Sequence, residues 1–149
     1  MKKLVVVQCG GKKVWNDNPN LGKVEAKNAY TSPYFQKNRL YAEKIGDKWM
    51  ILSAKYGFIE PSEQIENYNV TFKQKKTNPI TFNELKDQVK TKKLNQYDKI
   101  IVLGGKEYLY AIKEAFQDTN CNIESPFEGL TIGIRMSKLN EELQKTCKI

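Results

Sequence analysis

Hydrophobic runs that are typical of buried strands recur along the chain, and segments with helical spacing of apolar residues separate them. The clearest runs cover residues 4–7, 49–52 and 99–103 and are made of large apolar side chains apart from Lys99. Such continuous runs are typical of strands buried on both faces of a parallel sheet. A short extended segment at 121–123 predicts one further strand.

Helix start signals precede the amphipathic segments. Thr31-Ser32-Pro33 combines a hydroxyl that can cap a helix with a proline that the first turn tolerates, and Gly46 ends the pattern behind it. Thr81-Phe82-Asn83-Glu84 has the spacing of a capping box. We expect helices over residues 33–46, 81–94, 107–116 and 132–146.

Strands and helices therefore alternate, which predicts an α/β fold. Right-handed crossovers then give a three-layer sandwich, with a mostly parallel four-stranded sheet and helices on both faces. No repeat or linker marks a boundary, so we expect a single domain over residues 1–149. Residues 14–30 and 58–78 are expected to be irregular. Ligands of such sheets bind beyond the carboxyl ends of the strands.

Composition narrows the chemistry. The chain has 149 residues and no histidine, which excludes Ser-His-Asp and Cys-His catalysis and histidine zinc sites. Three cysteines, Cys9, Cys121 and Cys147, lack metal-ligand spacing and point to a reducing compartment. No apolar run approaches the roughly 20 residues of a membrane helix. We expect a cytoplasmic protein with no membrane association, no metal and no cofactor.

The net charge of +8 suggests an anionic partner, a nucleotide or a nucleic acid. Only Arg39 and Arg135 are arginines, however, and lysine lacks the bidentate fork that recognises bases and phosphates. The densest basic stretches, residues 73–76 and 86–93, are interpreted either as a solvated helix face or as a phosphate-binding track.

Glycine-containing loops follow the predicted strands and supply the candidate ligand-binding residues. The first loop is either an anion-binding loop or a simple turn with a buried Cys9, and as a nucleophile Cys9 would need activation by Lys12 or a helix terminus. The candidates for ligand binding are Gln8, Cys9, Gly10, Gly11, Lys13, Tyr56, Gly57, Tyr68, Gly104, Gly105, Tyr108 and Glu128. Tyr56 and Tyr68 are expected on loops, where they can stack a nucleobase.

Ser53-Ala54-Lys55-Tyr56-Gly57 and the acids behind it supply the candidate catalytic residues. Lys55 can act as a base on Ser53, or it can pair with a carboxylate while Gly57 takes a positive φ. Glu66 can stabilise a cation or activate water, or it can be a solvated acid like Glu60 and Glu63.

Several strings together resemble a family of small uncharacterised bacterial and phage domains. That family shows C-x-x-x-K, Y-T-S-x-x-F-x-K, L-S-A-K-[HY]-G, I-x-P-Y-[DN]-x-T and P-[LF]-x-G-L-x-I-G. The corresponding positions here are Cys9 with Lys13, and residues 30–37, 51–57, 65–71 and 126–133. Asn67 stands where the family has proline. The resemblance covers nearly the full length.

The Ser-Ala-x-Tyr-Gly string at 53–57 is also similar to a domain of archaeal archaeosine-synthesis proteins, whose fold is thought to resemble that of uracil-DNA glycosylases. This resemblance implies a nucleobase or nucleoside context and N-glycosidic bond cleavage. The histidine motif of those glycosylases is absent.

The first hypothesis is therefore an N-glycosidase-like hydrolase acting on a nucleotide, nucleoside or nucleic acid. A carboxylate, Glu66 or Glu128, would stabilise the oxocarbenium-like transition state. The alternatives are a non-catalytic nucleotide- or nucleic-acid-binding module, with salt-sensitive affinity, and a protein-interaction adaptor with a large apolar surface patch.

Overall fold

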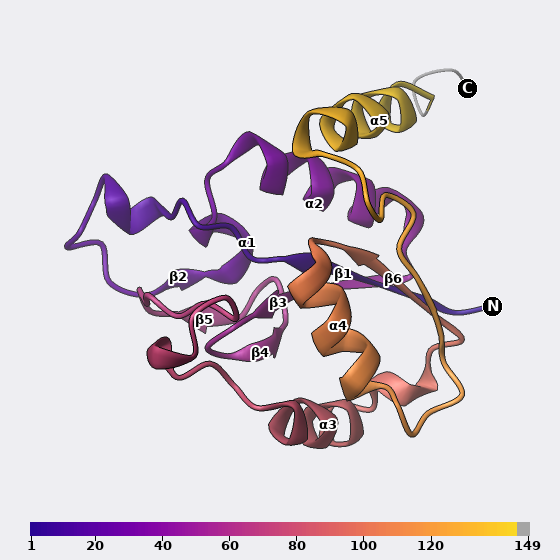
Figure 1. Ribbon diagram of the computed structural model, residues 1–149. Coiled ribbons are helices and arrows are strands. Elements are labelled where there is room, and N and C mark those ends of the chain that lie inside the picture. The colour runs from indigo at the N-terminus through magenta and orange to yellow at the C-terminus, as the bar shows by residue number, and fades with distance from the viewer. Residues whose placement is uncertain (146–149) are drawn as a thin grey trace.

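A five-stranded sheet forms the centre of the computed structural model, which describes residues 1–145 (Figure 1). The strand order is β4-β3-β1-β6-β7. The strands are β1 (Lys3–Gln8), β3 (Lys48–Ser53), β4 (Gly57–Ile59), β6 (Lys99–Leu103) and β7 (Asn122–Glu124). Four of them run parallel, and β4 is antiparallel to β3. The prediction of an α/β fold with a mostly parallel sheet is confirmed.

β1 occupies the middle of the sheet and pairs in parallel on both sides. Val5 lies opposite Trp49 on β3 and opposite Ile101 on β6. The side chains from Leu4 to Val7 are buried on both faces, as the continuous apolar run predicts.

Cys121 and Cys9 are free thiols, and Cys147 lies outside the described residues.

The expectation of four strands is wrong by one, because β4 begins in a segment whose sequence pattern is that of a loop. The chain reverses directly after β3, and Ile59, Phe58 and Gly57 pair with Ile51, Leu52 and Ser53. Gly57 has φ +77°, as expected for a glycine at this turn. Three residues are too few to show the alternation that identifies a strand in a sequence.

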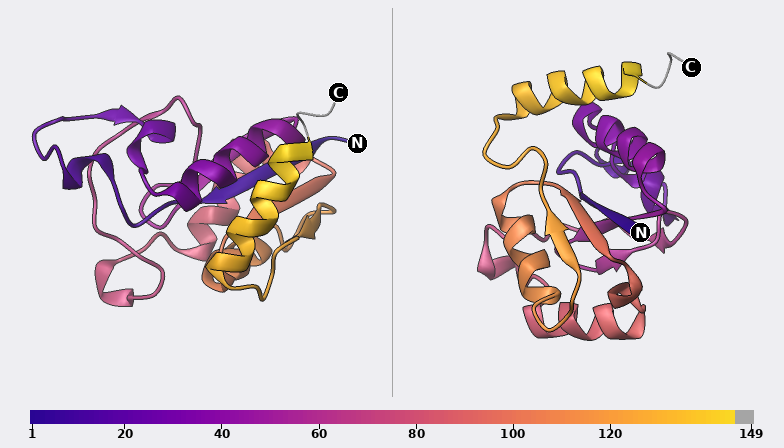
Figure 2. Two further views of the ribbon diagram at one scale, coloured as in Figure 1. Left: turned by 90° about the horizontal axis from the view of Figure 1, so that it is seen from above. Right: turned by 90° about the vertical axis from the view of Figure 1, so that its right-hand side faces the viewer.

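Helices lie on both sides of the sheet, and the two helices on each side pack against each other. Figure 2 shows α2 (Pro33–Ile45) and α5 (Ile132–Lys145) on one side and α3 (Phe82–Thr91) and α4 (Lys106–Ala115) on the other. The predicted start signals act as expected. Ser32 Oγ accepts a hydrogen bond from Phe35 N at 3.2 Å, and Thr81 and Glu84 form a capping box.

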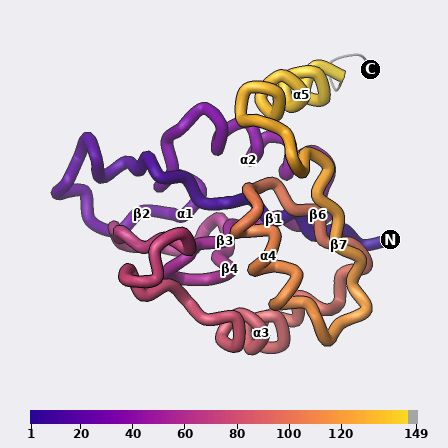
Figure 3. The backbone as a smooth tube through the Cα atoms, viewed as in Figure 1, coloured from indigo at the N-terminus to yellow at the C-terminus, as the bar shows by residue number. Residues whose placement is uncertain are grey.

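The two irregular segments contain short elements that the sequence pattern does not predict. β2 (Val24–Glu25) pairs with β5 (Gln64–Ile65), and α1 (Ala26–Ala29) follows β2 directly. Single 3-10 turns cover Val14–Asn16, Lys75–Thr77 and Leu94–Gln96. Figure 3 shows the two long segments beside each other, at the end of the molecule toward which β1 runs.

Within the described residues, no helix is both long enough and apolar enough to cross a membrane. No group of three or more acidic or thiol side chains in that part of the chain is arranged to hold a metal ion.

Replacing Gly57 with alanine is expected to destabilise the fold by about 2 kcal/mol, because an L-residue is strained at this φ and its Cβ would collide with the Gln88 side chain. Gln88 is held in place by hydrogen bonds with Phe58 N at 2.8 Å and Tyr56 O at 3.0 Å. Urea unfolding of Gly57→Ala measures the change in the free energy of unfolding.

The matched control is Gly133→Ala in α5, where a Cβ meets nothing within 4 Å. Alanine is the better helix former by up to about 1 kcal/mol, so this variant should be at least as stable as the parent chain. Equal stability of both variants would contradict the role assigned to Gly57.

Candidate functional site

A cavity of about 430 Å³ opens at the carboxyl edge of the sheet. Its size is that of a small-molecule site, and its position is the one at which parallel sheets bind ligands. Segments from five parts of the chain meet there. The lining residues are Gln8, Cys9, Gly10, Gly11, Ser32, Tyr34, Phe35, Lys73, Gly105, Glu107, Leu130, Thr131, Ile132 and Arg135.

Three helices begin at this cavity. Ser32 caps α2, Gly105 is the N-cap of α4, and Thr131 directly precedes α5. The first turn of a helix leaves N–H groups without intrahelical acceptors, and its dipole favours negative charge. Gly105 offers α4 no capping side chain. The backbone alone therefore makes this cavity suitable for an anion.

Arg135 adds a fixed positive charge to the same wall. Its side chain is buried, with Nε donating to Leu130 O at 2.9 Å and Nη1 donating to Gly104 O at 2.8 Å and to Tyr34 Oη at 3.2 Å. Within the described part of the chain, Nη2 donates no hydrogen bond. One edge of the guanidinium is thus fixed by the fold while the other can serve a ligand.

The Gly104-Gly105 loop is held between two side chains. Gln8 Oε1 accepts a hydrogen bond from Gly105 N at 2.7 Å, and Arg135 holds the carbonyl of Gly104. A Cβ on Gly104 would come within 2.9 Å of Gln8 Cβ, so the close approach of this loop to β1 requires glycine. This contact positions the start of α4 against the end of β1.

Charged side chains of both signs line the cavity. Lys73 and Arg135 contribute positive charge, and Glu107 contributes a partly buried carboxylate. Among the described residues, Glu107 is the one acidic side chain in this lining. The cavity can therefore bind an anion and also present a carboxylate to it.

Cys9 connects the cavity to buried tyrosines behind it. Its Sγ lies 3.3 Å from the hydroxyl of Tyr108, and the Tyr108 ring packs edge-on against Phe72. Burial, together with the adjacent Cys9, raises the pKa of Tyr108 above its ordinary value. The Tyr108 hydroxyl therefore remains protonated and available as a donor at neutral pH.

A second polar cluster lies deeper, around Tyr30 and Tyr68. Their hydroxyls are 2.6 Å apart, and burial raises the pKa of both. Lys13 Nζ lies 4.6 Å from the centroid of the Tyr68 ring, and burial lowers the pKa of this lysine. Tyr56 packs edge-on against Tyr68. Tyr68 is buried rather than free to stack a base.

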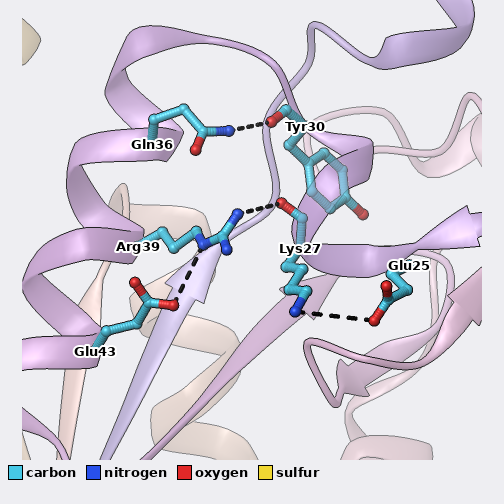
Figure 4. A network of polar contacts seen from close by, with 6 residues as sticks. All are labelled: Glu25, Lys27, Tyr30, Gln36, Arg39 and Glu43. Carbon is cyan, nitrogen blue, oxygen red and sulfur yellow. Dashed lines mark hydrogen bonds and ion pairs between the residues drawn. The ribbon is translucent and has the colours of Figure 1, made fainter.

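Polar contacts from α2 hold the backbone that carries Tyr30 (Figure 4). Gln36 Nε2 donates to Tyr30 O at 2.9 Å, and Arg39 Nη1 donates to Lys27 O at 3.1 Å. Arg39 also pairs with Glu43 at 3.4 Å. The position of the tyrosine cluster therefore depends on the helix whose N-terminus lines the cavity.

Ser53 and Lys55 do not come together as a catalytic pair in the described structure. Ser53 is fully buried, and its Oγ accepts hydrogen bonds from the backbone N–H groups of Lys55 and Tyr56, both at 3.1 Å. Lys55 Nζ lies over the Tyr56 ring, 5.2 Å from its centroid. The structure places Ser53 as a cap of the turn between β3 and β4.

The two candidate carboxylates lie outside this cavity. Glu66 is exposed, with its carboxylate 3.8 Å from Lys23 Nζ and its backbone against the hydroxyl of Tyr56. Glu128 lines a smaller adjoining cavity of about 220 Å³, together with Gly104 and Arg135. Of the other predicted residues, Gln8, Cys9, Gly10, Gly11 and Gly105 line the main cavity.

Nine residues in the lining are not among the site residues predicted from the sequence, and they include Tyr34, Lys73, Glu107 and Arg135. Arg135 follows the matched string at 126–133 by two positions and is one of two arginines in a chain rich in lysine. The rarity of arginine is the feature of the sequence that could have identified Arg135 as a site residue. Glu107 lies two positions after Gly105 and directly before Tyr108, both of which are predicted site residues, and this proximity is the signal for Glu107.

Comparison with known proteins gives a family without an assigned activity. A model of a family of unknown function, DUF6884, matches residues 4–141. The uncharacterized protein YfjM of Bacillus subtilis (strain 168) is 36% identical over 149 residues, which covers 97% of each chain. No solved structure gives a significant match.

These matches confirm the expectation of an uncharacterised family. The resemblance to the glycosylase-like domain stays a prediction, since neither match carries it. Because the family model spans most of the chain, including β1, the glycine loops and Arg135, the chain belongs to the DUF6884 family.

Proposed function

We propose that the chain binds the phosphate of a nucleotide or nucleic acid in the cavity at the carboxyl edge and hydrolyses the N-glycosidic bond of that ligand. The observation that carries the proposal is the convergence of three helix N-termini and the guanidinium of Arg135 on one cavity. Phosphate is the biological anion that such an arrangement binds best, because oxygens on several sides can each accept a hydrogen bond.

The size and lining of the cavity support a ligand larger than phosphate alone. Its volume of about 430 Å³ accommodates a sugar and a base, and Tyr34 supplies aromatic surface beside Arg135. Tyr34 also contacts Arg135 through its hydroxyl, so the aromatic wall and the cationic wall are continuous.

Glu107 supplies the acid–base group that a chain without histidine must take from another type of side chain. In hydrolysis, the bond between C1′ and the base nitrogen breaks, and a water oxygen forms the new bond to C1′. A carboxylate stabilises the positive charge that develops on the sugar and accepts a proton from the water, and the departing base takes up a proton. We place Glu107 in this role because it lines the cavity that holds Arg135.

A binding module without catalysis is the second candidate. The same helix N-termini and Arg135 favour a binding module. It differs from the proposed hydrolase only in that Glu107 takes no part in chemistry. Nucleotide binding without release of base would select this candidate.

Arg135→Lys is expected to weaken the binding of a nucleoside monophosphate by about ten- to a hundredfold, because lysine keeps the charge but does not have the planar fork. Calorimetric titration measures the change. Arg39→Lys, on the side of α2 that faces α1 and outside the lining of the cavity, is the matched control and should bind like the parent chain.

Near-ultraviolet circular dichroism of Arg135→Lys distinguishes weaker ligand recognition from a disrupted fold, since Arg135 also holds two backbone carbonyls. A correctly folded variant with unchanged affinity would overturn the assignment of the phosphate site.

Glu107→Gln is expected to reduce release of free base at least about a hundredfold while retaining nucleotide affinity, because the amide cannot accept the proton or stabilise the cation as a carboxylate does. Chromatography of the products from nucleosides, nucleotides, NAD, DNA and RNA measures release. Glu66→Gln tests the exposed acid in parallel.

Loss of activity in Glu66→Gln with normal activity in Glu107→Gln would transfer the catalytic role to Glu66. Absence of base release by the parent chain from every substrate, together with retained nucleotide binding, would contradict the hydrolase and leave the binding module.

A further inference from the structure

An apolar groove lies directly beside the cavity and has no role in the function proposed above. Its volume is about 710 Å³, and Glu107 lines both the groove and the cavity. The remaining lining residues are Phe72, Lys75, Asn78, Pro79, Ile80, Thr81, Phe82, Lys106 and Tyr110. They come from the segment that contains the 3-10 turn at Lys75–Thr77, from the start of α3 and from the first half of α4.

Two exposed aromatic rings form one wall. Phe82 at the start of α3 and Tyr110 on α4 stack with centroids 5.4 Å apart and an interplanar angle of 21°. They are 39% and 51% exposed, which places them among the most exposed large apolar side chains of the described residues. A stacked pair with this much free surface can accept a further ring or apolar group on it.

Lysines flank this aromatic wall. Lys75 and Lys106 line the groove, and Lys73 lines the adjoining cavity, against the single carboxylate of Glu107 in the two linings. Lysine ammonium groups attract phosphates as point charges without reading base edges. Aromatic stacking surface beside such cations is the combination that binds single-stranded nucleic acid without sequence preference.

The continuity of groove and cavity determines how such a strand would lie. Lys73 faces the cavity and Lys75 faces the groove, so the segment between them runs along the boundary of the two. A nucleotide bound at Arg135 would have its neighbour at the start of α3 and α4, with its base against Phe82 and Tyr110. A mononucleotide would leave this second position empty.

We infer that the groove binds the nucleotide adjacent to the one in the cavity, so that the ligand of this protein is a single-stranded nucleic acid rather than a free nucleotide. This inference rests on the proposed function, because it assumes that the phosphate site at Arg135 is occupied. The charge of the flanking lysines favours a polyanion over a neutral apolar peptide as the occupant.

The test compares a fluorescently labelled six-nucleotide thymidine strand with thymidine monophosphate by anisotropy and calorimetry. The parent chain should bind the strand at least about tenfold more tightly than the monophosphate, since each stacked base adds to affinity. Phe82→Leu with Tyr110→Leu should remove most of that gain and leave monophosphate affinity unchanged. The leucines keep the groove apolar while they abolish ring stacking.

Leu40→Ala, a truncation of an exposed apolar side chain on α2, is the matched control and should change neither affinity. Lys75→Gln with Lys106→Gln should reduce the slope of log affinity against log salt by about 0.7 for each phosphate that a lysine neutralises in the parent complex. This slope reports the electrostatic part independently of stacking.

The outcomes separate the two proposals. If the monophosphate binds and the strand binds no more tightly, or if the leucine variant keeps full strand affinity, the groove is not a stacking site and the inference is overturned. If neither ligand binds, the phosphate site itself fails. The inference is also overturned if an apolar peptide binds the parent chain and the leucine variant equally well while neither of them binds the strand.

Discussion

The parallel pairing of β1 with both β3 and β6 is the constraint from which the site follows. The strand β1 is buried on both faces and pairs in parallel along both edges, so β3 and β6 end at the same edge of the sheet as β1. The helices α2, α4 and α5 come after β1, β6 and β7 along the chain, and these three strands run in the same direction. The N-termini of α2, α4 and α5 therefore meet at one edge without any long-range polar contact being needed to bring them there.

Arg135 turns this geometric consequence into a site with defined chemistry. A buried guanidinium is unfavourable unless its donors are satisfied, and two of its nitrogens are satisfied by Leu130, Gly104 and Tyr34. These contacts join the start of α5 to the glycine loop before α4 and to the first turn of α2. The same contacts leave Nη2 for a ligand, so the residue connects the three helix ends structurally and adds charge where their dipoles converge.

Local signals predict the fold well because each acts within a few residues. The apolar run at residues 4–7, the proline after Ser32 and the capping box at Thr81 all specify elements through neighbours in the chain. β4 escapes prediction since its three residues pair only with β3 across a turn. The sheet edge that holds the cavity is predictable from topology, and the glycine loops that line it are predicted with it.

The side chains of the site are less predictable. Their roles depend on whether folding points each side chain into the core, toward the cavity or toward solvent. Ser53 illustrates this: the hydroxyl turns inward and caps the backbone of the next residues, so it is buried although it ends a strand at the functional edge. Glu66 and Glu107 show the converse. Both are acids near predicted loops, yet Glu66 follows β5, where it pairs with Lys23 at the surface, while Glu107 lies in the first turn of α4. An acid in that first turn lies at the edge where the N-termini of the helices meet, and the helix dipole stabilises its negative charge there. In a chain without histidine, the helix that carries a carboxylate to that edge therefore has more influence on its chemistry than the motif that surrounds it in the sequence.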